Sequence, residues 1–90
     1  MNDDDTIKAE VRRYVGENWL VMRQGMTVGD DESLLLRGVI DSLGVVDLVS
    51  FVEQRWDVKV DAPEIVEANF GTFNAIARFV HDRVRSVGLG

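Results

Sequence analysis

The sequence predicts an all-α domain, and three observations lead to this prediction. In several segments, apolar residues recur at the spacing of a helix that buries one face. No segment alternates apolar and polar residues over the length of a strand. Residues with helix-capping side chains precede the apolar patterns. We therefore expect a four-helix bundle with three longer helices, one short third helix, and a long ordered loop between the first two helices.

The first helix is expected to begin at the acidic run Asp3–Asp5, because carboxylates there cap a helix and interact favourably with its N-terminal end. The apolar pattern extends to about Trp19 or Met22, and Gly25 indicates that the helix has ended. The inward positions of this helix are Ile7, Val11, Tyr14 and Val15.

Residues 24–41 are predicted to form the loop, since they contain three glycines and a cluster of acidic residues. The loop also contains five large apolar residues, namely Leu34, Leu35, Leu36, Val39 and Ile40. At least some of them must pack on the core, so we expect the loop to be ordered. Loops of this length are uncommon in compact domains and are often functional.

The second helix is expected to begin at Asp41 and Ser42, whose side chains suit an N-cap. Its inward positions follow helical spacing and are Val45, Leu48, Val49, Val52 and Trp56. Its outward positions are Leu43, Asp47, Ser50 and Gln54, with Val46 and Glu53 on the flank. Gly44 lies in the first turn, where it lowers the helix propensity.

The third helix is expected to be short. It begins at Asp61–Glu64, which combines an N-cap acid, an early proline and a glutamate three residues on, and it ends near Asn69. Gly71 and Thr72 then separate it from the fourth helix, which is expected to end before Gly88. The inward positions of the fourth helix are Phe73, Ile76, Ala77, Val80 and Val84.

The composition restricts the class of protein. A chain of 90 residues predicts one domain spanning residues 1–90, with flexible ends at about 1–4 and 86–90, and nothing in it calls for an oligomer. The net charge of −6 argues against a nucleic-acid partner. The absence of cysteine excludes disulfides, thiolate metal sites and a cysteine nucleophile. Short apolar runs and an acidic N-terminus predict a cytoplasmic protein that does not enter a membrane.

The negative charge is concentrated in the middle of the chain. Residues 41–69 carry seven acidic side chains against Arg55 and Lys59, which gives −5 over this segment. Such a block suits contact with basic surfaces of partner proteins. A solvated surface that only keeps the protein soluble is an equally good interpretation of the charge taken alone.

The segment from Gly38 to Gly44 reads Gly-Val-Ile-Asp-Ser-Leu-Gly, and it strongly resembles the acyl and peptidyl carrier protein family. The segment from Asn69 to Ile76, which reads Asn-Phe-Gly-Thr-Phe-Asn-Ala-Ile, is similar to the turn and last helix of discrete members. The resemblance extends from the first helix to about Arg83. It implies a four-helix bundle of acyl-carrier type that is not an enzyme.

The resemblance also implies roles for the residues that match the motif. Ser42 would accept 4′-phosphopantetheine from coenzyme A, and Asp41 would help a phosphopantetheinyl transferase to hold its metal ion. Leu43 would pack into the transferase and into later partners, and Asp47 and Glu53 match acidic positions that meet basic partner enzymes. We add Val46 and Ser50 to this predicted partner surface because both lie off the inward stripe.

The residues agree with such a role on physical grounds. A serine at the end of a long loop is accessible, and a phosphodiester at a helix N-terminus is favoured by the backbone N–H groups and the helix dipole. The simpler interpretation is that Asp41 and Ser42 only cap the helix.

The cargo is less well specified by the sequence. Gly44 stands where many fatty-acid carriers have an acid, and Gln54 and Arg55 dilute the acidic run. We therefore expect an acyl cargo, bound as a thioester, in a secondary-metabolite, polyketide-like or fatty-acid-like pathway. The expected partners are an acyl- or aminoacyl-loading ligase or transferase and downstream synthase enzymes. The alternative is a stand-alone aminoacyl or peptidyl carrier of the nonribosomal-peptide type.

Other functional classes also have to be weighed. An unmodified helical interaction module is the alternative from another class, and the intact Asp41-Ser42-Leu43 sequence argues against it. A hydrolytic set of Asp41, Ser42 and His81 lacks the residues of a nucleophile elbow. The aromatic residues Phe51, Phe70, Phe73 and Phe79 could line an acyl pocket, although core packing is the simpler interpretation. Trp19 and Trp56 are expected to anchor the core.

Overall fold

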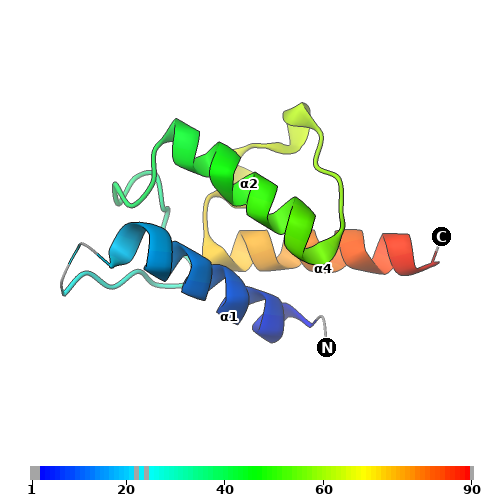
Figure 1. Ribbon diagram of the computed structural model, residues 1–90, viewed down its shortest axis with the longest axis horizontal. Coiled ribbons are helices and arrows are strands. Elements are labelled where there is room, and N and C mark those ends of the chain that lie inside the picture. The colour runs from blue at the N-terminus through cyan, green and yellow to red at the C-terminus, as the bar shows by residue number, and fades with distance from the viewer. Residues whose placement is uncertain (1–2, 22, 24, 90) are drawn as a thin grey trace.

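Helices account for all the regular structure in the part of the chain that the computed structural model describes, which is the backbone of residues 3–21, 23 and 25–89 and the side chains as far as residue 85. The elements are α1 (Asp4–Val15), the π-helical turn η1 (Gly16–Leu20), α2 (Ser42–Trp56), the 3-10 turn η2 (Ala62–Glu64), α3 (Glu67–Phe70) and α4 (Phe73–Leu89). Figure 1 shows α1, α2 and α4 as the long helices, with the loop of residues 21–41 at one end. The all-α prediction is confirmed.

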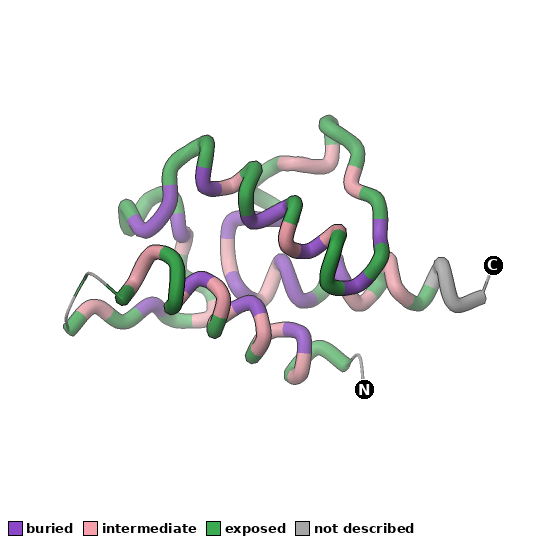
Figure 2. Tube along the Cα trace, in the orientation of Figure 1, coloured by how far each residue is buried: buried purple, intermediate pink, exposed green. Residues whose placement is uncertain are grey.

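The core lies between the three long helices. α1 packs most extensively against α4, and α2 covers both (Figure 1). The buried side chains follow the predicted stripes, so that purple segments in Figure 2 face the middle of the molecule from all three helices. Three predicted inward positions, Tyr14, Val45 and Val84, are only half-buried, and Gly44 beside Val45 is buried although it was not predicted to be. No helix among the described residues is long and apolar enough to cross a bilayer.

The first helix changes its hydrogen-bonding pattern near its C-terminal end. A capping interaction begins α1 as predicted, since the Asp3 carboxylate accepts the N–H of Thr6 at 2.8 Å. After Val15 the chain widens into the π-helical turn η1, which ends at Leu20. In this turn Trp19 and Leu20 are neighbours in sequence, yet both pack against the core. Single π-turns of this kind are often found at functional sites.

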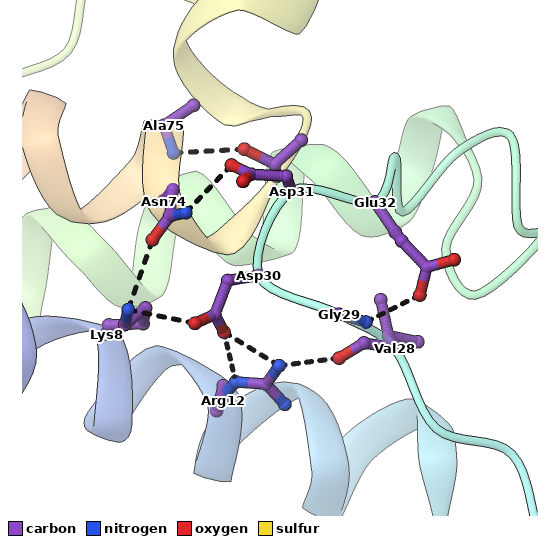
Figure 3. Close-up of polar contacts among 10 residues, drawn as sticks. Lys8, Arg12, Val28, Gly29, Asp30, Asp31, Glu32, Asn74 and Ala75 are labelled. Atoms are coloured by element: carbon purple, nitrogen blue, oxygen red, sulfur yellow. Dashed lines mark hydrogen bonds and ion pairs between the residues drawn. The ribbon is translucent and has the colours of Figure 1, made fainter.

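Residues 25–41 of the loop pack on the core, as predicted, and Asp30 joins them to two helices (Figure 3). The Asp30 carboxylate accepts hydrogen bonds from Lys8 Nζ at 2.9 Å and from Arg12 Nε at 2.8 Å, both on α1. Its backbone carbonyl accepts the N–H of Asn74, in the first turn of α4, at 3.0 Å. The Asn74 side chain also bonds to Lys8 and to Asp31. One loop residue, Asp30, therefore joins α1 to α4.

The pH dependence of folding should report on this junction. The hydrogen bonds from Lys8 and Arg12 hold the pKa of Asp30 below its usual value. Such a carboxyl stabilises the fold above its unfolded pKa, and the stabilisation is lost as the pH falls through the folded pKa. The pKa of Lys8 is raised in turn by Asp30, so its contribution is lost only at strongly alkaline pH.

We therefore expect the melting temperature to fall as the pH drops below about 4. Asp30→Asn should lower the melting temperature at pH 7 and make the remaining acid dependence shallower. It will not abolish that dependence, because the pKa values of Glu32 and Glu64 are also lowered by hydrogen bonds. Thermal unfolding followed by circular dichroism between pH 7 and pH 3 measures both effects. An Asp30→Asn protein with the full acid dependence of the wild type would contradict this assignment.

The prediction of one continuous third helix is wrong, because the structure divides this segment into η2 and α3. The capping box at Asp61 is present, with the Asp61 N–H donating to Glu64 Oε1 at 3.0 Å. Val66 is extended, with φ −132° and ψ 163°, so the helix cannot continue through it. The Asn69 side chain donates instead to the Glu64 carbonyl at 2.9 Å. Local side-chain hydrogen bonds thus replace the helical ones that the pattern predicted.

The fourth helix is longer than predicted, since it includes Gly88 and ends at Leu89. Glycine lowers helix propensity but does not prevent the right-handed conformation, so a single glycine near the end does not terminate a helix. The flexible ends expected at 1–4 and 86–90 lie mostly outside the described residues, namely at residues 1–2, at residue 90 and in the side chains of 86–89.

Candidate functional site

The N-terminal end of α2 separates the roles of Asp41 and Ser42. Asp41 is the N-cap, with an extended backbone, and its Oδ1 accepts the N–H of Gly44 at 2.8 Å. Its carbonyl accepts the N–H of Val45 at 3.0 Å. Ser42 is the first helical residue and is exposed. Within the described residues its hydroxyl makes no hydrogen bond, so Asp41 alone caps the helix and Ser42 is free for another role.

The loop delivers Ser42 to the surface through a turn whose anchor is Leu34. This side chain is completely buried, and its carbonyl accepts the N–H of Val39 at 2.9 Å. Gly38 turns the chain with φ +72°, a conformation that other residues rarely adopt. Val39 and Ile40 then return to the core. Ser42 therefore follows a segment that is anchored in the core, although that segment ends a long loop.

Residue 44 lies close to two side chains, which the sequence did not reveal. A Cβ atom at this position would lie 3.0 Å from Ile40 Cβ and 3.4 Å from Trp19 Cζ2. A Cβ atom at residue 44 would therefore crowd Ile40, whereas its contact with the Trp19 indole would be an ordinary van der Waals contact. Close packing against Ile40 accompanies the absence of the acid that many fatty-acid carriers have at this position.

The predicted partner surface is exposed except at one residue. Leu43 and Val46 are 78% and 55% exposed, and Asp47 and Ser50 are also exposed. Glu53 is half-buried instead, and its Oε2 accepts the N–H of Val60 at 2.9 Å. This hydrogen bond gives Glu53 a structural function on the connection after α2, whereas its predicted contact with partners stays a prediction.

The structure adds three apolar residues that sequence analysis did not assign to this surface. Leu35, Leu36 and Val66 are exposed, and Leu35 and Val66 share a pocket with Val45 of α2. We call the set Leu35, Leu36, Leu43, Val46 and Val66 the apolar rim. Exposed apolar residues that form a contiguous patch commonly mark a partner surface, and Leu35 and Val66 meet in this way. The pattern of α2 could identify only Leu43 and Val46, because the others come from the loop and from the start of α3.

An open groove lies beside Ser42, on the side of the loop and η1. We call it the Ser42 groove, and it is lined by Trp19, Arg23, Leu35, Gly38, Asp41 and Ser42 among others. Its volume is about 550 Å³, which is within the range of roughly 300–1,000 Å³ for small-molecule sites. An exposed hydroxyl with this much free space beside it fits the covalent attachment of a prosthetic group of that size.

The four phenylalanines do not line one common acyl pocket, because two are buried in the core whereas Phe51 and Phe79 are half-buried and line separate open pockets beside charged residues. Phe70 and Phe73 are buried, and the ring of Phe51 stacks on Tyr14 with a centroid separation of 4.0 Å. Phe70 contacts Phe79 on a different side of the core, at 5.1 Å. The nearby pocket that includes Phe70 has only about 70 Å³. A cavity that holds benzene has roughly 150 Å³, so this one would have to expand to admit an acyl chain.

The tryptophans and His81 differ in their surroundings. Trp56 is buried as predicted, although its Nε1 is buried without a hydrogen-bond partner among the described residues. Trp19 is half-buried between the core and the Ser42 groove.

His81 Nδ1 lies 3.1 Å from Asp4 Oδ1, at the start of α1. That position is at the opposite end of the molecule from the start of α2 (Figure 1), so the hydrolytic set is not assembled.

Comparison with known proteins places the chain in a family. No family model matches it. It is 35% identical over 74 residues to the D-alanyl carrier protein of Streptococcus sanguinis, an alignment that covers 82% of this chain and 90% of the relative. It is 34% identical, with the same coverage, to the D-alanyl carrier proteins of Streptococcus gordonii and Streptococcus thermophilus.

These relatives are carriers and not catalysts, and proteins of their kind bear a covalent 4′-phosphopantetheine group. The free hydroxyl of Ser42 and the groove beside it fit that group. The chain therefore belongs to the family of discrete phosphopantetheine carrier proteins that includes the acyl and peptidyl carriers.

Proposed function

We propose that the chain is an aminoacyl carrier whose 4′-phosphopantetheine arm is attached to Ser42. The observation that carries this proposal is the exposed Ser42 hydroxyl, which makes no hydrogen bond within the described residues, in a chain whose relatives are named D-alanyl carrier proteins. These names favour the aminoacyl alternative over the fatty-acid or polyketide cargo that was the first expectation. When bound, the arm supplies a terminal thiol on which the cargo is held as a thioester.

The residues around Ser42 would each contribute to this function. In the modification step, Ser42 Oγ forms a bond to the phosphorus of the pantetheine phosphate, the adenosine bisphosphate part of coenzyme A leaves, and the serine proton passes to the transferase or to solvent. Asp41 holds the first turn of α2 in place through its bond to the Gly44 N–H, which leaves the second carboxylate oxygen free to assist a transferase-bound metal ion. The apolar rim and Asp47 would meet the transferase and the loading ligase.

The cargo can be tested by loading the modified protein. The holo-protein, prepared with a phosphopantetheinyl transferase of broad specificity, is offered D-alanine with a D-alanine-activating ligase, and fatty acids with an acyl-carrier synthetase. We expect the intact mass to rise by one alanyl group in the first reaction and to remain unchanged in the second. Efficient loading by fatty acids alone would refute the aminoacyl assignment while leaving the carrier function in place.

Charge reversal at Asp47 should slow loading without affecting folding. Asp47 is exposed on the outward face of α2, one turn beyond Leu43. A charge this exposed contributes little to stability, so its reversal should leave the fold intact. A lysine at this position would repel a basic partner and so lower the rate of encounter. We expect Asp47→Lys to reduce the kcat/KM of loading by about five- to tenfold at low salt, less at high salt.

The matched control is Asp82→Lys, which changes the net charge by the same amount on the exposed surface of α4. It should load at nearly the wild-type rate, because α4 carries none of the predicted partner residues. Equal loss of kcat/KM in both variants would mean that only the overall charge matters and that Asp47 has no specific role.

A further inference from the structure

We propose that the Ser42 groove is the resting site of the phosphopantetheine arm, with Arg23 beside the phosphodiester and Trp19 against the pantetheine. This inference rests on the proposed attachment at Ser42. It concerns where the arm lies when no partner enzyme holds it.

The first argument is position. Ser42 itself forms part of the groove, so a group attached to its Oγ begins inside the groove. Asp41 and Gly38 also line this groove, and Trp19 and Leu35 supply apolar surface in it. The tether makes the local concentration of the arm high, and a weak contact is then enough to hold it.

The second argument is charge. Arg23 is the basic side chain of the groove, and among the described residues it forms no ion pair with a carboxylate. Its nearest polar contact is the Sδ atom of Met26, at 3.9 Å. A phosphodiester on Ser42 would also face the carboxylate of Asp41, whose repulsion needs an opposite charge nearby. The Arg23 guanidinium supplies that charge within the same groove.

The third argument is a comparison of the volume and charge of the Ser42 groove with those of a second pocket. The alternative resting place is the pocket between α2 and α3, which is lined by Leu35, Val45, Val66 and Glu67. That pocket has about 70 Å³ against about 550 Å³ for the Ser42 groove, and it contains a glutamate and no basic residue. Both its volume and its charge are unfavourable for a phosphate with a long amide-containing arm.

The fourth argument is the conformation of η1. The π-helical turn brings the half-buried Trp19 over Gly44, where its indole forms a wall of the groove next to the start of α2. An aromatic face offers stacking area for the amide groups of pantetheine at small cost in side-chain entropy. The indole is close enough that a Cβ atom at residue 44 would lie 3.4 Å from Trp19 Cζ2.

Nuclear magnetic resonance of the intact protein tests the proposal. The indole N–H signals of Trp19 and Trp56 are assigned with a Trp56→Phe variant and followed as the wild type is converted from the apo to the holo form. We expect the Trp19 signal to shift on modification, whereas the signal of the buried Trp56 at the far end of α2 stays in place. In holo-protein with a ¹³C-labelled arm, the pantetheine methyl groups should show nuclear Overhauser effects to the Trp19 ring.

Removing the positive charge should release the arm. We expect Arg23→Gln to lower the intensity of the arm-to-Trp19 effects by about two- to fivefold, as for the loss of one exposed ion pair. Arg13→Gln removes an equal charge from an exposed position on α1 and should leave these effects unchanged.

Two other results have separate meanings. If intact mass shows no modification of Ser42, the proposed function fails together with this inference. If Ser42 is modified but the arm contacts Val45 and Val66, or contacts no protein group, only the resting site in the Ser42 groove is refuted.

Discussion

Ser42→Ala is expected to take up no phosphopantetheine while the wild type gains one group per chain. The reason is chemical, because the exposed Ser42 hydroxyl is the atom to which the phosphate would be bonded, and alanine has no replacement for it. The fold should survive, since Asp41 provides the N-cap and Ser42 contributes no hydrogen bond to it within the described residues. We expect the stability to change by less than about 0.5 kcal/mol.

Intact mass after incubation with coenzyme A, Mg²⁺ and a transferase of broad specificity measures this effect, with circular dichroism as the test of folding. Thr27→Ala is the control, because Thr27 carries an exposed hydroxyl outside the predicted partner surface and should leave modification complete. A Ser42→Ala protein that is still modified would place the attachment site elsewhere. A large loss of helicity would mean that Ser42 has a mainly structural role.

Leu34→Ala is expected to destabilise the fold by about 2–5 kcal/mol, the usual cost of removing a fully buried leucine side chain. Leu34 is 0% exposed although it belongs to the loop, and its N–H donates to the Gly71 carbonyl at 2.8 Å. A chain of this size has a total stability of only about 5–13 kcal/mol, so a substantial part of it depends on one loop residue. The loop that supports Ser42 should loosen together with the core.

Leu36→Ala provides the control two residues away, because Leu36 is 89% exposed. Its effect on the free energy of unfolding should stay within about 0.5 kcal/mol. Urea unfolding of both variants measures the difference, and hydrogen exchange of the Val39 and Ile40 amides shows whether the loop is affected. If Leu34→Ala were as mild as Leu36→Ala, the loop would not be anchored to the core in the way described.

The site could be located from sequence because its determinants are local. The capping chemistry of Asp41 and the apolar stripe that ends at Trp56 define α2, and Ser42 follows from its place at the start. The division of labour, in which Asp41 caps and Ser42 does not, could not be derived. It depends on which residue adopts the extended backbone conformation, and both side chains are suitable for an N-cap.

The features that sequence analysis missed depend on contacts between distant segments. Trp19 reaches Gly44 because η1 is a π-helical turn, and nothing in the pattern of apolar residues distinguishes it from an ordinary last turn. Arg23 and Leu35 line the same groove as Ser42, and this depends on the path of a loop that Asp30 ties to α1 and α4. At the break, Val66 is extended and the Asn69 side chain donates to the Glu64 carbonyl, and neither feature follows from helix propensity, which would allow continuation.

The direction of α2 has a practical consequence for experiments with partner enzymes. The start of this helix lies at one end of the molecule, and the start of α1 and the end of α4 lie at the other (Figure 1). A bead, a dye or a fused protein joined to either end of the folded region would therefore stand away from Ser42. The carrier can be immobilised through such a linkage, and several enzymes can be passed over it in turn, with the serine still facing the solution.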